Sequence, residues 1–161
     1  MPSSHVHIEP ATEKDLSLIL SFIKGLAEYE RLADKVVATE EILKESLFGR
    51  RRYAEVLIAR YNGEPAGFAL FFHNYSTFLA RPGIYLEDLF VVPDMRGKGI
   101  GRALLVRLSK LSIELNCGRL EWSVLDWNEL AINFYKKVGA VPLSDWTVFR
   151  LTGEALEKLA R

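Results

Sequence analysis

Apolar residues recur at helical spacing in the first part of the chain. They form a stripe of Leu16, Ile19, Leu20, Ile23, Leu26 and Ala27. The stripe predicts a helix to about Arg31, because apolar side chains spaced three and four residues apart share one helix face. Thr12 followed by Asp15 is typical of a cap at its start. A second, shorter helix is expected to begin near Thr39, and Gly49 with the arginines at residues 50–52 ends it in a solvated turn.

Two β-rich runs follow, at residues 54–61 and 66–72, and Asn62-Gly63 separates them. This dipeptide favours the positive φ angles of a tight hairpin turn, so the two strands are expected to be antiparallel. A short extended segment at residues 6–8 precedes the first helix. After the hairpin we expect a loop that contains Asn74, Ser76, Arg81, Pro82 and Gly83.

A third long strand is predicted at residues 84–92, and its mostly apolar character favours a central place in the sheet. Pro93 ends it, a glycine-rich turn follows, and leucines at helical spacing then predict a helix. The next strand is expected at residues 120–125, the next helix at 128–138, and a last strand at 148–151. This order indicates a mixed fold of helices and sheet.

Length and composition limit the number of domains and the kinds of partner that the chain can have. A chain of 161 residues with 49% hydrophobic residues has the size of one domain, here residues 1–161, and is too apolar to be disordered. Lys plus Arg and Asp plus Glu number 21 each, so no net charge favours nucleic acid or an anionic membrane as a partner. No stretch reaches the roughly 20 apolar residues that cross a bilayer.

The cysteine and histidine content argues against a disulfide-bonded protein and against a metal site. Cys117 is the one cysteine, so no internal disulfide is possible, and the start of the chain lacks the apolar stretch of a secretion signal. A cytoplasmic location is therefore expected. The histidines, His5, His7 and His73, lack the spacing of metal ligands, so no metal site is predicted.

The glycine-rich turn is the most specific chemical signal. Its alternating glycines leave consecutive backbone N–H groups open to a ligand at the start of a helix. This arrangement suits a phosphate or a pyrophosphate, and the cationic side chains add positive charge at the same place. The turn comprises Arg96, Gly97, Lys98, Gly99, Ile100, Gly101 and Arg102.

Other interpretations of this turn compete with that one. The nucleotide triphosphate loop requires Gly-x-x-x-x-Gly-Lys-Ser/Thr, which no stretch here supplies. A dinucleotide fold requires Gly-x-Gly-x-x-Gly after the first strand of a βαβ unit, whereas these glycines follow two helices and a hairpin. A turn that only links a strand to a helix stays possible on the local sequence alone.

Arg-x-x-Gly-x-Gly between an apolar strand and a Leu-rich helix resembles the pyrophosphate-binding motif of GNAT acetyltransferases. Within that superfamily the chain is similar, over nearly its whole length, to the diamine acetyltransferase family, which includes spermidine/spermine N1- and thialysine Nε-acetyltransferases. The resemblance implies an α+β fold, with a mixed, mostly antiparallel twisted sheet flanked by helices on both faces and central strands that splay apart. The resembling segments are residues 8–12, 26–30, 85–91, 96–101 and 127–140.

The resemblance also implies acetyl-coenzyme A as the cosubstrate. The pantetheine arm would fill the gap beside the third long strand, along Leu89, Phe90 and Val91, and would pair with backbone groups of Leu89 and Val91. The glycine-rich turn, from Arg96 to Arg102, would hold the pyrophosphate. Asn128 and Lys137 would contact the cofactor further along.

Acetyl transfer to an amine requires a base, because an alkyl amine with a pKa of about 10 is charged at neutral pH. Glu87 is the candidate, because burial in an apolar strand would raise its pKa, and in the resembling family a glutamate acts through a water. The competing interpretation is structural: alternation along the strand would put Glu87 on one sheet face and Asp88 on the other, each satisfied by local hydrogen bonds. Asp88 is then a structural or substrate-orienting group.

The thiolate that leaves acetyl-coenzyme A needs a proton, and Tyr135 is the candidate acid. Its phenol, with an ordinary pKa of about 10, could donate a hydrogen bond to a thiolate of pKa about 8.5. A tyrosine at a helical position is more often a packing residue. The match of residues 133–137 to the family's general-acid segment favours catalysis.

The resemblance nominates a set of substrate-binding residues, which offer carboxylates and aromatic faces to an ammonium group. We expect a thialysine- or lysine-like amine or a small diamine, acetylated by direct attack in a ternary complex, and a homodimer. Spermidine/spermine enzymes carry an acidic residue where this chain has Asn74 to Thr77, so a long polycation would lose an anchor here. A polyamine substrate and a non-catalytic coenzyme A-binding module are the alternatives. The nominated residues are Tyr29, Glu30, Glu87, Glu121, Trp122 and Ser123.

Overall fold

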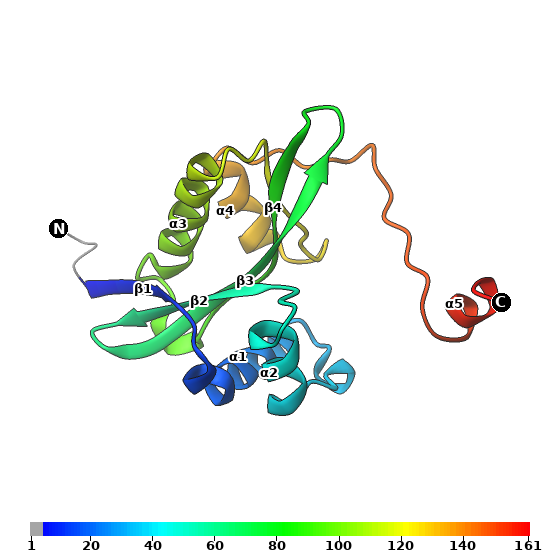
Figure 1. Ribbon diagram of the computed structural model, residues 1–161. Helices are drawn as coiled ribbons and strands as arrows, with labels where there is room; N and C mark the ends of the chain where they lie inside the picture. The colour runs from blue at the N-terminus through cyan, green and yellow to red at the C-terminus, as the bar shows by residue number, and fades with distance from the viewer. Residues whose placement is uncertain (1–4) are drawn as a thin grey trace. The chain divides into compact units, whose positions relative to one another are not determined.

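The computed structural model describes residues 5–161, which divide into two compact units on either side of the Ser123–Val124 bond. Residues 1–4, which contribute to the expectation about a secretion signal, lie outside the described residues. The first unit contains one sheet in the order β1-β2-β3-β4-β5 (Figure 1). Its strands are β1 (Val6–Pro10), β2 (Glu55–Tyr61), β3 (Glu64–Ser76), β4 (Arg81–Val91) and β5 (Leu120–Trp122).

Neighbours from β1 to β4 pair antiparallel, and β5 pairs with β4 in parallel. This confirms the mixed, mostly antiparallel sheet. Asn62 and Gly63, with φ angles of 50° and 84°, form the tight turn between β2 and β3 that the dipeptide predicted.

The first two helices begin where their caps predicted. The Thr12 amide donates to Asp15 Oδ2 at 2.8 Å, although the first turn is a 3₁₀ helix. Thr39 Oγ1 accepts from the Ile42 amide at 3.2 Å and caps the second helix. The helical segments of the first unit are η2 (Glu13–Asp15), α1 (Leu16–Tyr29), η3 (Ala33–Lys35), α2 (Glu40–Phe48), η4 (Pro93–Met95) and α3 (Ile100–Glu114).

Apolar side chains cover both faces of the sheet. α1 and α2 lie on one face and α3 on the other (Figure 1). Leu57 and Ala69 alternate with the residues of the α1 side and therefore face α3, where Leu104 and Leu108 are fully buried. Each buried side chain of this size contributes about 2 kcal/mol, so helices on both faces stabilise the sheet. The core on the α1 side consists of Ile19, Phe22, Leu43, Leu47, Val56, Ile58, Phe68 and Phe90.

The prediction of a long loop between the second and third long strands is wrong. β3 and β4 continue to pair as Asn74 opposite Gly83, Tyr75 opposite Pro82 and Ser76 opposite Arg81, so only residues 77–80 form the turn. The polar residues and Pro82 that suggested a loop lie at the solvent-exposed end of a two-stranded arm. There polar side chains need no burial, and a proline is tolerated at the start of a strand.

Two expectations for the end of the chain are also wrong. β5 ends at Trp122 instead of residue 125, and residues 148–151 pair with no other strand within residues 5–161. An apolar run forms a strand only where a partner strand accepts its hydrogen bonds, and composition does not reveal that partner. A helix that the sequence did not predict, α5 (Gly153–Leu159), follows instead.

The predicted fourth helix is confirmed as α4 (Glu129–Lys137) in the second unit. Asn128 Oδ1 accepts from the Ala131 amide at 3.3 Å and caps its start, and Gly139, with a φ of 97°, follows its end. Among residues 5–161, no helix combines the length and the apolar character that crossing a membrane requires.

Candidate active site

The strand β4 has a partly open edge. It pairs with β5 only from Ile84 to Leu86, opposite Leu120 to Trp122. Beyond Leu86, the described part of the chain places β3 on one side of β4 and no paired strand on the other. The predicted parting of the central strands is therefore confirmed. Its consequence is a row of backbone N–H and C=O groups that an extended ligand could pair with.

The three residues expected along this edge differ in their surroundings. Leu89 and Val91 are half-buried. Phe90 points into the core on the α1 side, where its ring centroid lies 6.2 Å from that of Phe22. Any contact of Phe90 with a ligand at this edge would therefore come from its backbone.

A β-bulge interrupts β4 at Glu87. Leu70 pairs with Asp88 and Phe71 pairs with Leu86, so Glu87 has no partner on β3. The bulge moves the alternation by one residue, and Asp88 lies on the same sheet face as Leu70, toward α1. The strict alternation expected for the two carboxylates therefore does not apply.

Three carboxylates gather at this bulge, and we call Glu30, Glu87 and Asp88 the carboxylate cluster. Burial raises the pKa of Asp88 to about 7, with smaller contributions from the negative charges of Glu87 and Glu30. Burial and the Glu87 charge also raise the pKa of Glu30. Glu87 itself is exposed, so the desolvation expected at Glu87 falls on Asp88 instead. A carboxyl group with a pKa of about 7 can take up and release a proton at neutral pH.

The glycine-rich turn leads from η4 into α3. Gly97 and Gly99 have φ angles of 80° and 79°, and a Cβ at either position would meet no atom within 4 Å. Gly99 is the N-cap of α3 and no side chain caps this end, so the amides of the first helical turn have no partner within the helix. Free amides, left-handed glycines and open space around them suit a diphosphate.

The cations of the turn differ in what they contact. Arg96 Nε donates to the Val91 carbonyl at 3.0 Å, and its guanidinium lies 4.7 Å from the Tyr29 ring centroid. Lys98 Nζ lies 5.2 Å from the Tyr61 ring centroid, and all three cations are exposed. Arg96 therefore connects the end of β4 to the end of α1, a contact that the sequence did not predict.

At the end of α1, Tyr29 contacts Arg96, and Glu30 lies close enough to Glu87 on β4 for the two charges to interact. The other predicted substrate residues belong to β5 and the residue after it. Glu121 lies opposite Tyr85, and the Ser123 hydroxyl is 2.7 Å from the Tyr85 hydroxyl. Trp122 is half-buried and alternates onto the other sheet face. The sequence missed Asp88 as the buried carboxyl, because nothing in its composition marks a bulge.

Three further predicted residues belong to the second unit and are described within it. Asn128 caps α4, and Lys137 is exposed in its last turn. Tyr135 is half-buried on the same helix, with its ring centroid 5.7 Å from that of Phe134. Among the residues described, no group of three or more His, Cys, Asp or Glu side chains is placed to hold a metal ion.

Comparison with known proteins identifies related chains. Residues 23–140 match the model of the acetyltransferase (GNAT) family. The chain is 39% identical to a thialysine N-epsilon-acetyltransferase of Bos taurus, with 96% of this chain and 97% of the relative covered. It is 34% identical to an L-ornithine N5-acetyltransferase of Arabidopsis thaliana, with 94% and 86% covered. The structure of an integron cassette protein from the V. cholerae mobile metagenome is similar too, with a TM-score of 0.82, 31% identity and 98% of both chains covered.

Proposed function

The chain belongs to the acetyltransferase (GNAT) family, and from that premise we propose that it transfers an acetyl group from acetyl-coenzyme A to a primary amine of a small molecule. The observation that carries this proposal is the open edge of β4, which has the uncapped glycine turn at its end and the carboxylate cluster beside it. One site thus combines a diphosphate binder, a slot for an extended chain and a proton acceptor.

The glycine turn would hold the diphosphate through the amides at the start of α3, and Lys98 and Arg102 would add positive charge there. Arg96 would stabilise the start of the turn, because its guanidinium lies over the Tyr29 ring. Backbone groups of Leu89 and Val91 would pair with the extended arm, and Asn128 and Lys137 would add contacts. The bound thioester supplies an electrophilic carbonyl and a thiolate leaving group.

Proton removal from the amine is assigned to the pair Glu87 and Asp88. Glu87 is exposed at the bulge and can reach an amine directly or through a water. Asp88, with a pKa of about 7, would hold the proton at neutral pH. The two carboxylates also attract the ammonium form of the substrate, which then loses its proton inside the site.

Proton delivery to the departing thiolate is assigned to Tyr135. A phenol hydrogen bond that strengthens as negative charge grows on sulfur lowers the barrier without a full transfer in advance. The position of Tyr135 on α4, one turn before the glycine stop of that helix, matches the family segment that supplies this acid.

The amine is proposed to be thialysine- or lysine-like or a small diamine, bound by Tyr29, Glu30, Glu87, Glu121, Trp122 and Ser123. The names of the relatives from Bos taurus and Arabidopsis thaliana support an amine on the side chain of an amino acid. A polyamine is the alternative, and a relative named spermidine/spermine N(1)-acetyltransferase-like protein 1, 32% identical over 97% of this chain, keeps it open.

We also assign the activity to one domain that includes both units, since the family match at residues 23–140 crosses the boundary after Ser123. A cytoplasmic location and a homodimer complete the proposal, with no nucleic acid or membrane as partner. Exposed apolar side chains in the second unit support an assembly that buries them. They include Val141, Leu143, Trp146, Val148 and Phe149, each at least 61% exposed.

The test follows the free thiol released from acetyl-coenzyme A with thialysine, lysine, putrescine, spermidine and glucosamine as acceptors. Amine-dependent release, fastest with thialysine, lysine or putrescine, is expected. Release fastest with spermidine would favour the polyamine alternative. Absence of release with every amine, although acetyl-coenzyme A binds, would favour a coenzyme A-binding module without catalysis.

A further inference from the structure

Three polar side chains, one within β5 and one on either side of that strand, form a row on one face of the sheet. Arg119, Glu121 and Ser123 alternate with Leu120 and Trp122, so the polar and the apolar residues point to opposite faces. We call Arg119, Glu121 and Ser123 the β5 polar row. Its first and last residues are exposed and its middle residue is half-buried, which leaves the row accessible from solvent.

The β5 polar row shares its sheet face with the carboxylate cluster. Asn74 Nδ2 donates to Glu121 Oε1 at 3.3 Å, and the Ser123 hydroxyl lies 2.7 Å from the Tyr85 hydroxyl. On β3, Asn74 alternates in phase with Leu70, which pairs with Asp88 and packs on the α1 side. A ligand could therefore touch the row and the cluster without crossing the sheet.

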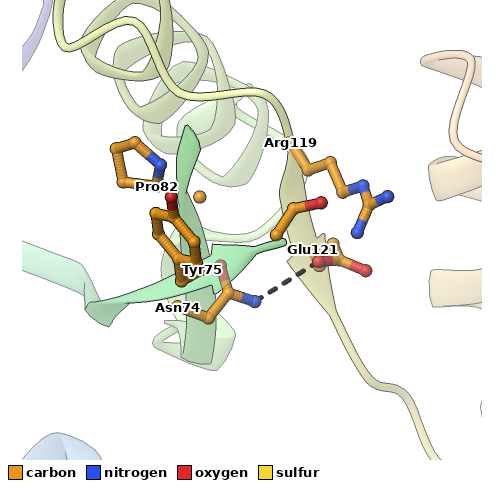
Figure 2. A pocket seen from close by; sticks show the side chains of 7 residues that line it. Asn74, Tyr75, Pro82, Arg119 and Glu121 are labelled. Carbon is orange, nitrogen blue, oxygen red and sulfur yellow. Dashed lines mark hydrogen bonds between the residues drawn. The ribbon is translucent and has the colours of Figure 1, made fainter. Parts of the chain in front are cut away.

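A shallow hollow marks one end of the row. Asn74, Tyr75, Pro82, Arg119 and Glu121 line it together with Ser76 and Gly83, as Figure 2 shows for the five labelled side chains. A Cβ at Gly83 would lie 2.3 Å from Asn74 Oδ1, so only glycine leaves the amide free to reach Glu121.

The charges at the hollow are complementary to those of a zwitterion. The Asn74 amide directs the Glu121 carboxylate, which keeps lone pairs for a further donor. Within residues 5–161, no carboxylate lies at ion-pair distance from Arg119, and its guanidinium is exposed. A site for an anion, at Arg119 just before β5, and a site for a cation, at Glu121 within β5, are thus two residues apart.

The distance along the sheet fits an amino acid. Glu121 lies opposite Tyr85, two residues before Glu87 on β4, which corresponds to about 7 Å of strand. From the α-carbon to the side-chain nitrogen, an extended lysine or ornithine spans about 5 to 6 Å by standard bond lengths. A side-chain amine at the carboxylate cluster would therefore leave the α-carbon near Glu121.

On the basis of the proposed acetyl transfer, we propose that this hollow binds the head group of an α-amino acid whose side-chain amine is acetylated. Glu121, held by Asn74, receives the α-ammonium group, and Arg119 receives the α-carboxylate. A diamine of equal length would use Glu121 and leave Arg119 without a ligand. The two residues therefore separate amino acids from diamines.

The experiment compares L-lysine with cadaverine, which lacks only the carboxylate, in the thiol-release assay. Arg119→Gln should raise the KM for lysine about 5-fold, the upper end of what one exposed ion pair contributes, and leave that for cadaverine within about 2-fold. Glu121→Gln should raise the KM for both amines, and kcat should change little in both variants because neither side chain touches the reacting atoms. Arg107→Gln, on the exposed face of α3, is the matched control and should leave both KM values unchanged.

Equal effects of Arg119→Gln on lysine and cadaverine, or no effect on either, would overturn the assignment while the acetyl transfer itself stands. A wild-type KM for cadaverine at or below that for lysine would also count against it. If wild-type protein releases no thiol with any amine, the proposed function fails and this inference fails with it.

Discussion

The glycine turn and the carboxylate cluster lie near opposite ends of the open edge of β4, and they present different chemical groups to a ligand. The turn offers backbone amides and left-handed glycines, whose charge distribution does not change with pH. The cluster offers carboxyl side chains of which Asp88 has a pKa of about 7. The difference indicates a division of labour: the turn supplies affinity for the cofactor, and titratable side chains supply the rate.

Removing the proposed acid should have the largest effect on rate. Tyr135→Phe should lower kcat by on the order of 100-fold, because the thiolate then departs without a hydrogen-bond donor. Affinity for acetyl-coenzyme A should stay unchanged, which steady-state kinetics and a binding titration would check together. Tyr53→Phe, at an exposed tyrosine, is the control. An unchanged kcat would return Tyr135 to a packing role.

The opposite pattern is expected at the turn. Gly99→Ala should weaken acetyl-coenzyme A binding about 30-fold, as expected when about 2 kcal/mol of amide contacts is lost to a methyl group in the ligand's place. Ligand at 100 times its wild-type Kd should stabilise the native protein by about 2.7 kcal/mol and the variant by much less, which a thermal shift would detect.

Gly63→Ala is the matched control for the turn. Gly63 has a φ of 84° and equally open space, so alanine there brings the same backbone strain far from the ligand. Equal loss of ligand stabilisation in both variants would mean that strain, and not contact with the diphosphate, explains the effect.

At the cluster, Asp88→Asn should lower kcat/KM about 10-fold above pH 8 and have little effect below pH 6. The reason is that Asp88 accepts a proton only when ionised, which happens as the pH rises through about 7. Protonation of the substrate amine affects wild type and variant equally, so it cancels in the ratio of their kcat/KM values. A ratio that is independent of pH would exclude Asp88 as the proton holder.

The same substitution predicts a change in stability. The folded-state pKa of Asp88 lies above the ordinary value of 3.8. The contribution of this group to the free energy of unfolding of the wild type therefore falls as the pH rises from about 4 to 7. Asp88→Asn should therefore raise Tm relative to wild type above pH 7 and change it little near pH 4. Asp94→Asn, at an exposed carboxylate, should show no such trend.

The smallest effect is expected where the two regions are joined. Arg96→Lys keeps the charge but loses the planar contact with Tyr29 and the Nε bond to Val91. We expect an increase of about 3-fold in the KM for the amine, since Tyr29 and Glu30 are then held less firmly. Arg52→Lys, whose guanidinium lies 5.9 Å from the Phe48 ring centroid, is the control in the same kinetic assay.

The turn could be predicted from the sequence because its chemistry depends on glycines at fixed local spacing. Thr12, Thr39 and Asn128 predict the starts of their helices for the same reason, since a cap acts within one helical turn. The assignment to the family likewise depended on local motifs that occur in order along the chain.

The cluster could not be predicted fully, because it depends on which residues pair across strands. The bulge that leaves Glu87 unpaired and buries Asp88 arises from the register of β3 against β4, to which residues far apart in sequence contribute. The strand positions of Asn74 and Pro82 depend on pairing in the same way, as does the absence, within residues 5–161, of a partner strand for residues 148–151. Local composition carries no information about such pairing.

Calorimetric titration of acetyl-coenzyme A into the wild-type protein tests the central claim most directly. Saturable binding at one site per chain is predicted, retained in Asp88→Asn and strongly weakened in Gly99→Ala. Absence of binding heat in the wild-type protein with both acetyl-coenzyme A and coenzyme A, across several temperatures, would contradict the account.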